Sequence, residues 1–133
     1  MTIPSLESVA MQVTEALREL HERPVRTQLR RALATLPVAA LAVDDVARIV
    51  VTNHAAAQLT GYSVQELVRL AVPDITAQTD QPYTEVLWNA FLTQGQQRGR
   101  YDIRRKDGDI VTVDYLAIAN AVPGLHLSLL RAI

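Results

Sequence analysis

The chain has 133 residues, of which 49% are hydrophobic, and its 13 basic and 14 acidic residues leave a formal net charge of -1. This composition predicts one folded domain with an appended element, and it provides no general attraction to nucleic acid or anionic membranes. The sequence contains no cysteine, which excludes disulfides, cysteine zinc sites and cysteinyl–flavin adducts. Apolar runs are too short to span a membrane and the N-terminus lacks a signal-peptide pattern, so we expect a cytoplasmic protein.

The first 36 residues are predicted to form an amphipathic helical arm. Apolar residues recur at a spacing of three and four, which places them on one face of a helix. Pro24 interrupts this pattern and predicts either a kink or the start of a second helix. The arm either packs on its own domain or forms the seam of a homodimer. Its apolar face consists of Leu6, Val9, Val13, Leu17 and Leu20.

Two β-rich stretches follow, residues 38–43 and 48–52. They flank a polar turn at Asp44 and Asp45, and this arrangement predicts a hairpin. The hairpin leads directly into a segment in which helical patterns are unusually short.

This segment, "TNHAAAQLTGYSVQEL", is predicted to form two short helices. Asn53 can cap the first helix, which ends at Gly61, where a left-handed residue is favoured. Ser63 and Glu66 have the spacing of a capping box for the second helix. Helices this short are stable only when they pack against a larger structure.

The remaining pattern predicts one turn, one longer helix and three strands. The turn follows Pro73, and the helix covers residues 82–93. The third and fourth strands meet at Asp107-Gly108, a strong hairpin signal, and a turn at Pro123-Gly124 leads to the fifth. The order predicts an α+β fold in which a five-stranded antiparallel sheet carries helices over one face. The strands are residues 98–106, 109–121 and 125–133.

This order resembles the PAS family of sensory domains. The likeness rests on "LPVAALAVDDVARIVVTNHAAAQLTGYSVQEL", "RRKDGDIVTVD" and "LHLSLLRAI", and it covers residues 36–133. It implies a PAS-like sensory domain at residues 37–133, preceded by the helical arm at residues 1–36. The final "LRAI" departs from the Arg-Asp-Ile-Thr that is frequent in the family. Either the natural chain continues beyond this point or the module works without a linked effector.

The resemblance also implies a function. PAS-like modules relay ligand occupancy or partner contact through dimer geometry to an effector, without catalysis of their own. We therefore expect a homodimer that acts on a kinase or a transcription regulator, as in two-component signalling. No direct contact with nucleic acid or membrane is expected from this segment.

Strand alternation, read with the likeness to flavin-binding members, predicts a pocket on the inner face of the sheet. The expected lining consists of Ile103, Val113, Tyr115, His126, Ser128 and Leu130, with Trp88 from the longer helix. The opposite face is too apolar to face water, so the arm, or a partner's arm, is expected to cover it. That outer face carries Leu116, Ile118, Leu127 and Leu129.

The sequence disfavours two cofactors that PAS-like domains bind. Flavin-binding members hold the ring with polar side chains, whereas Ile103, Val113 and Leu130 stand at the matching positions. Haem-binding members ligate iron with a histidine on the longer helix, and here His54 and His126 lie elsewhere. The expected pocket is aliphatic, which suits a fatty acid or another small apolar molecule, or holds no ligand.

Two alternatives compete with this interpretation. A cone fold of the ketosteroid-isomerase kind would be an enzyme or small-molecule binder, with a carboxylate beside a tyrosine. The candidate pairs, Asp102 with Tyr101 and Asp114 with Tyr115, are neighbours on strands and point to opposite faces. The other alternative is a purely structural dimerisation module without a ligand. We expect no enzymatic activity, since the sequence lacks a nucleophile–base set, metal-ligand spacing and a phosphate loop.

Overall fold

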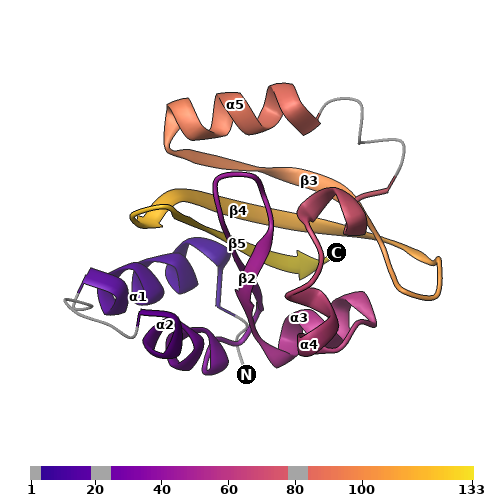
Figure 1. Ribbon diagram of the computed structural model, residues 1–133, viewed down its shortest axis with the longest axis horizontal. Coiled ribbons are helices and arrows are strands. Elements are labelled where there is room, and N and C mark those ends of the chain that lie inside the picture. Colours follow the sequence, from indigo (N-terminus) through magenta and orange to yellow (C-terminus); the bar gives the residue numbers. More distant parts are fainter. Residues whose placement is uncertain (1–3, 19–24, 78–83) are drawn as a thin grey trace.

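The computed structural model describes residues 4–18, 25–77 and 84–133, and these form a twisted antiparallel sheet flanked by helices (Figure 1). The sheet has five strands in the order β2-β1-β5-β4-β3, and each neighbouring pair is antiparallel. The strands are β1 (Ala39–Val43), β2 (Ile49–Thr52), β3 (Gln96–Arg104), β4 (Ile110–Val122) and β5 (Leu125–Ala132). The helices are α1 (Leu6–Arg18), α2 (Val25–Ala34), α3 (His54–Thr60), α4 (Val64–Leu67) and α5 (Thr84–Gln94), with the 3-10 helix η1 (Val72–Ile75). The predicted fold class is confirmed.

Local signals in the sequence place most of these boundaries. Gly61, with φ +80, ends α3, and Gly108, with φ +93, turns the β3–β4 hairpin. These angles lie in the left-handed region that glycine adopts without strain. The expected interruption at Pro24 lies outside the described residues, as does the expected start of the longer helix at residue 82. Described helices, α1 and α2, flank the position of Pro24 in the chain.

The helices α1 and α2 lie on one face of the sheet, which we call the outer face (Figure 1). Ser5 begins α1, since its Oγ accepts a hydrogen bond of 3.1 Å from the N–H of Ser8. The apolar stripe of α1 is buried against alternating strand residues, whereas Met11 on the opposite side is 73% exposed. The main members of this outer cluster are Leu6, Val9, Val13, Leu17, Leu29, Leu33, Ala40, Ala42, Leu116, Leu127 and Leu129.

Asn53 joins the outer helices to the sheet and to α3. It is buried, and its Oδ1 accepts hydrogen bonds from the N–H groups of Ala40 and Ala56. Its Nδ2 donates to the carbonyls of Leu33 and Val38 at 2.9 and 3.0 Å. The sequence predicted only the cap on α3, which is one of these four bonds.

The other face, the inner face, is covered by α3, α4, η1 and α5 (Figure 1). A short segment around η1 crosses from one edge of the sheet to the other. Ala71 forms a bridge with Arg48 beside β2, and Thr76 forms one with Ile103 in β3. The N–H of Ala77 also donates to the carbonyl of Asp102 at 2.9 Å. The sheet therefore curls so strongly that the seven residues from Ala71 to Ala77 link its two edge regions, and it encloses space on this side.

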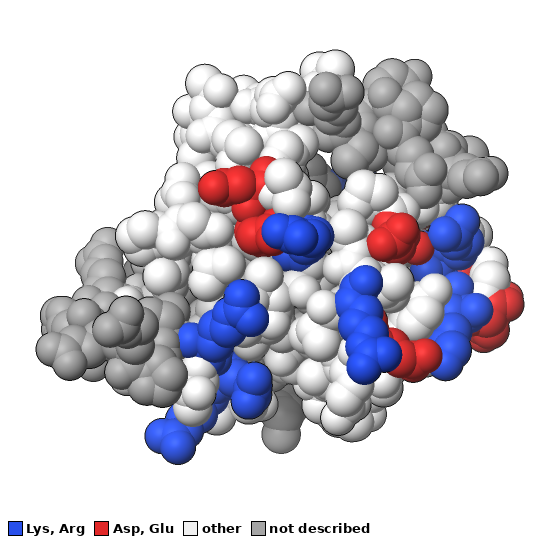
Figure 2. Space-filling model, viewed as in Figure 1, with Lys and Arg blue, Asp and Glu red and all other residues white. Residues whose placement is uncertain are grey.

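Charged side chains are unevenly spread over the visible surface (Figure 2). Arginines of α2 gather at the lower left, and a mixture of both signs lies at the right, over the β3–β4 hairpin and α4. The described surface over α5 carries no charge in this view.

Candidate functional site

The broken helices form one wall of the inner face, and local bonds hold each piece. Ser63 and Glu66 form the predicted capping box of α4, with bonds of 3.1 and 2.9 Å. The end of α3 is held by the β3–β4 hairpin, whose Lys106 N–H donates to the carbonyl of Thr60 at 2.9 Å. Arg105 Nε donates to the carbonyl of Leu59 at 3.1 Å. These bonds satisfy helix ends that would otherwise leave unpaired carbonyl groups.

An ion pair strengthens this contact at the surface. Lys106 Nζ lies 2.6 Å from Glu66 Oε2. The hydrogen bond from Lys106 and that from the Ser63 N–H lower the pKa of Glu66 below its ordinary value. The hairpin, α3 and α4 are therefore linked by both backbone and side-chain bonds.

Between the sheet and α5 the inner face is hollow. A cavity of about 380 Å³ opens there, close to the lower limit of small-molecule pockets in proteins. Its lining is mostly apolar and comes from η1, α5 and four of the five strands. The lining residues are Leu41, Val43, Val72, Thr76, Trp88, Phe91, Gln97, Arg100, Tyr101, Tyr115, Ala117, His126, Leu127 and Ser128.

The polar groups on the floor of the cavity come from one region of the sheet. Gln97, Ala117 and Ser128 are cross-strand partners in a single row, and Tyr115 stands in the next row opposite Gly99. A Cβ at position 99 would lie 3.3 Å from the Tyr115 ring, so glycine lets this ring lie across β3. Burial raises the pKa of Tyr115, so its hydroxyl stays protonated at neutral pH.

His126 lines the cavity but is fully engaged. Its side chain is 1% exposed, and its Nδ1 accepts a hydrogen bond of 2.9 Å from the N–H of Asn120. The proton of the neutral ring is therefore on Nε2, which lies 2.8 Å from a carboxylate oxygen of Asp45. The indole of Trp88 donates to the backbone carbonyl of Asp45 at 3.1 Å. Together these bonds tie the β1–β2 turn to α5 and β5.

The structure brings together part of the predicted lining. Trp88, Tyr115, His126 and Ser128 face the cavity. Ile103, Val113 and Leu130 are instead completely buried in the packed part of the inner cluster, toward α3 and α4. The alternation assigned these three residues to the inner face, but it carries no information on where along that face space remains.

Several lining residues were not identified from the sequence. Tyr101, Gly99 and Gln97 share the face of Ile103 by strand alternation, so extending the pattern along β3 would have found Gln97 and Tyr101. Phe91 lies one turn beyond Trp88 on α5. No sequence signal identifies Val72 and Thr76 as lining residues. They lie in the irregular segment around η1, which has no helix or strand periodicity to indicate where its side chains point.

The residues predicted for the arm or dimer interface lie together on the outer face of a single chain. Leu6, Val9, Val13 and Leu17 of α1 are buried in one cluster with Leu116, Leu127 and Leu129, and Ile118 packs at its edge. Leu20 lies outside the described residues. Within one chain, the apolar stripe of α1 is therefore already buried against the sheet.

The described residues contain neither a metal-binding cluster nor a membrane-spanning helix. No group of three or more His, Asp or Glu side chains is arranged to hold a metal ion in residues 4–18, 25–77 and 84–133. In the same part of the chain, no helix has the length and apolarity needed to cross a membrane.

Comparison with known proteins identifies relatives. The family model of the PAS fold matches residues 27–118, whereas no curated protein matches the sequence. A PAS domain from Colwellia psychrerythraea superimposes with a TM-score of 0.69 at 22% identity, covering 80% of this chain and 95% of that one. A PAS domain from a two-component sensor histidine kinase gives 0.67 at 16%, covering 78% and 92%.

A third solved structure comes from a transcriptional regulator of the LuxR family from Burkholderia thailandensis. Its PAS domain, in complex with ethanol, has a TM-score of 0.66 at 13% identity and covers 77% of this chain and 95% of that one. At these identities the solved structures establish a shared fold, and the family model adds a match at the level of sequence.

Proposed function

This chain belongs to the PAS family, whose members are typically sensory signalling modules of kinases and regulators, and we propose that it senses a small molecule in its inner cavity. Occupancy of the cavity is then relayed through the sheet to the arm and on to an effector. PAS domains are generally non-catalytic, and we propose no reaction for this one. The cone-fold alternative is set aside because the chain matches the PAS fold.

The observation that carries the proposal is the hollow between α5 and the sheet. Protein interiors are normally filled at the density of organic crystals, and the outer cluster of this chain follows that rule. A space of about 380 Å³ with hydroxyl and amide groups on its floor is not needed for packing. It has the properties of a binding pocket, namely apolar walls and a few polar groups that orient a ligand.

The sheet supplies a short path for the relay. Tyr115 faces the cavity, and its neighbour Leu116 is buried under α1. Ser128 likewise lies between Leu127 and Leu129, which belong to the outer cluster. A ligand that shifts β4 or β5 would therefore shift the surface on which the arm rests.

We propose homodimerisation through the part of α1 that the sheet leaves free. Met11 is 73% exposed beside a concavity of about 330 Å³ between α1 and the sheet. That concavity is lined by Glu7, Ala10, Met11, Thr14, Glu15, Gln96, Leu116 and Ile118. Movement of the arm would then alter the dimer geometry that a linked or bound kinase or transcription regulator receives.

Native mass spectrometry of freshly purified protein tests ligand binding. We expect a defined additional mass on the wild-type chain and its loss in Ala117→Leu, which fills the cavity. Ala34→Leu, at an exposed site on α2, is the matched control and should keep the mass. A wild-type protein that consists of bare chains would favour a purely structural module instead.

Light scattering after size exclusion tests the dimer. Met11→Glu should shift the protein toward monomer, because it places a charge in the proposed contact. Gln12→Glu adds the same charge at the next exposed position of α1 and should leave the dimer intact. A wild-type monomer, or a Met11→Glu dimer of unchanged stability, would contradict the proposed contact.

A further inference from the structure

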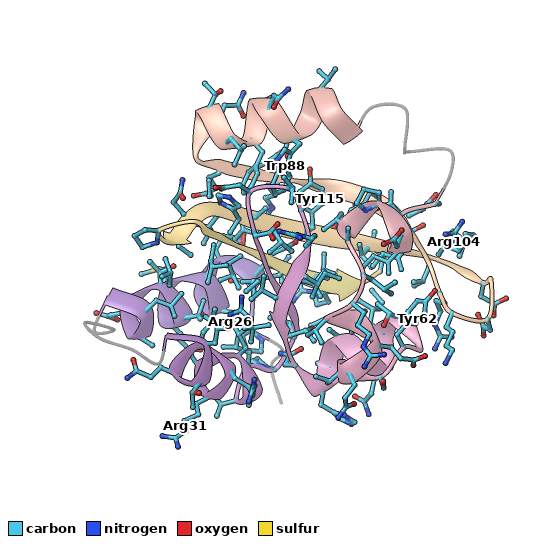
Figure 3. All side chains as sticks on the ribbon, viewed as in Figure 1. Arg26, Arg31, Tyr62, Trp88, Arg104 and Tyr115 are labelled. Carbon is cyan, nitrogen blue, oxygen red and sulfur yellow. The ribbon has the colours of Figure 1, made fainter. Side chains whose placement is uncertain are left out.

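The chain is poor in aromatic residues, yet most of them surround the cavity. The sequence contains one Trp, four Tyr and one Phe. The Trp, the Phe and two of the Tyr line this single cavity: Trp88, Phe91, Tyr101 and Tyr115. The sequence predicted an aliphatic pocket, and the structure corrects this, because irregular segments and α5 bring aromatic rings together over the sheet. Figure 3 shows Trp88 directed from α5 toward the sheet, next to Tyr115.

These rings form two groups that approach the cavity from different elements. On α5, the centroids of Trp88 and Phe91 are 5.5 Å apart with an interplanar angle of 50°. On the sheet, Tyr101 and Tyr115 are 5.3 Å apart at 80°. Aromatic rings prefer offset or edge-to-face contacts at such distances. A planar ring held between α5 and the sheet could make these contacts on both sides.

The charges near the cavity are already engaged in the described part of the lining. Arg100 Nε lies 2.9 Å from a carboxylate oxygen of Asp114, its cross-strand partner. Both ring nitrogens of His126 have partners. No Asp or Glu belongs to the described lining. The Arg100 side chain is also 68% exposed, so it lies mainly in solvent, and a buried anionic ligand would have to draw it away from Asp114.

Neutral hydrogen-bonding groups, in contrast, are available on the cavity floor. The Tyr115 hydroxyl, the Ser128 hydroxyl and the Gln97 amide make no hydrogen bond to another described residue, and each is partly accessible. Together they supply both donors and acceptors without charge. Groups of this kind discriminate between ligands because an unmatched polar group in a pocket is unfavourable.

We propose that the ligand is a compact uncharged aromatic molecule, of one or two rings, that carries a hydroxyl or amide group. The ring packs between the α5 rings and the two sheet tyrosines, and its polar group bonds with the floor. This inference rests on the proposed function and narrows it to a ligand class. It selects against the fatty acid considered from the sequence, whose carboxylate would have to compete with Asp114 for Arg100 of the described lining.

Isothermal titration calorimetry with three matched probes tests both parts of the inference. The probes are 2-naphthol, 2-naphthoate and decahydro-2-naphthol, which have similar size but differ in charge or in aromatic character. We expect 2-naphthol to bind about tenfold more tightly than either of the others. Equal or tighter binding of 2-naphthoate would contradict an uncharged ligand. Equal binding of decahydro-2-naphthol would contradict an aromatic one.

A conservative variant tests the role of the cavity floor. Tyr115→Phe keeps the ring and removes the hydroxyl, so the affinity for 2-naphthol should fall about fivefold. Binding of 2-fluoronaphthalene, followed by fluorine NMR, should not weaken, because this probe lacks the hydroxyl. Tyr62→Phe removes a hydroxyl outside the cavity lining and should leave both affinities unchanged. Equal loss for both probes would mean that Tyr115 acts through packing alone and would contradict the polar contact.

These measurements separate the ligand class from the proposed function. A retained mass that proves to be aliphatic or ionised, in a protein that binds none of the probes, would overturn the ligand class and leave the sensor proposal intact. Bare chains in native mass spectrometry together with no binding of any probe would overturn both.

Discussion

The two faces of the sheet are built from the same strands but are filled differently. On the outer face, leucine and valine side chains from α1, α2 and the strands form one closely packed cluster. On the inner face, the end near α3 and α4 is packed, whereas the end near α5 encloses a cavity with polar groups on its floor. The difference indicates that the outer face serves stability and that part of the inner face is free for function. Substitutions matched across the two faces can test this division.

The largest effect is expected for Leu116→Asp on the outer face. Leu116 is 2% exposed beneath α1, so the variant places an unpaired carboxylate in the outer cluster. We expect the free energy of unfolding to fall by about 4 kcal/mol, measured by urea denaturation. Leu116→Met, which nearly preserves volume, is the control and should cost less than about 1.5 kcal/mol. Wild-type stability and dimerisation of Leu116→Asp would show that the arm does not seal this face.

The second largest effect is expected for Asn53, which joins the outer helices to the sheet and to α3 on the inner face. Asn53→Ala removes four hydrogen bonds and leaves buried backbone groups without partners. We expect a loss of about 3 kcal/mol in the same denaturation experiment. Asn89→Ala, at an exposed site on α5, should stay within about 0.5 kcal/mol of wild type. Similar stabilities of the two variants would rule out Asn53 as a junction.

A matched pair of alanines compares the two faces directly. Ala42→Leu adds three carbons to the packed outer cluster and should cost about 2 kcal/mol. Ala117→Leu adds the same atoms to the cavity and should leave stability unchanged or raise it by about 0.5–1 kcal/mol. Thermal unfolding of both variants provides the measurement. A cost for Ala117→Leu equal to that of Ala42→Leu would mean that the inner face is as full as the outer one.

The smallest effect concerns the exposed ion pair that links the β3–β4 hairpin to α4. The lowered pKa of Glu66 means that its contribution to stability is present above the ordinary pKa of glutamate. That contribution is lost as the pH falls through the lowered folded value. Lys106→Met should raise the Glu66 pKa toward normal in a carbon-detected NMR titration, while the bond from the Ser63 N–H keeps part of the shift. An unchanged pKa would show that Lys106 has no influence on this carboxylate.

Much of the fold could be predicted from local patterns. Alternation along the strands assigned Tyr115 and Leu116 to opposite faces, and the capping residues Asn53, Ser63 and Glu66 located the short helices. These signals are local because a cap or a turn involves residues a few positions apart. Phe91 and Gln97, in contrast, become neighbours of the cavity only through the position of α5 over the sheet.

The sequence by itself determined which side chains each strand turns inward, where the helices break, and that the outer face needs a cover. Only the tertiary structure decided which inward residues are packed and which border a cavity. It also decided that Arg100 is paired with Asp114 and that both ring nitrogens of His126 have partners. The reason is physical. Periodicity fixes the direction of a side chain, whereas empty volume and hydrogen-bond partners depend on how far apart elements distant in sequence come to lie.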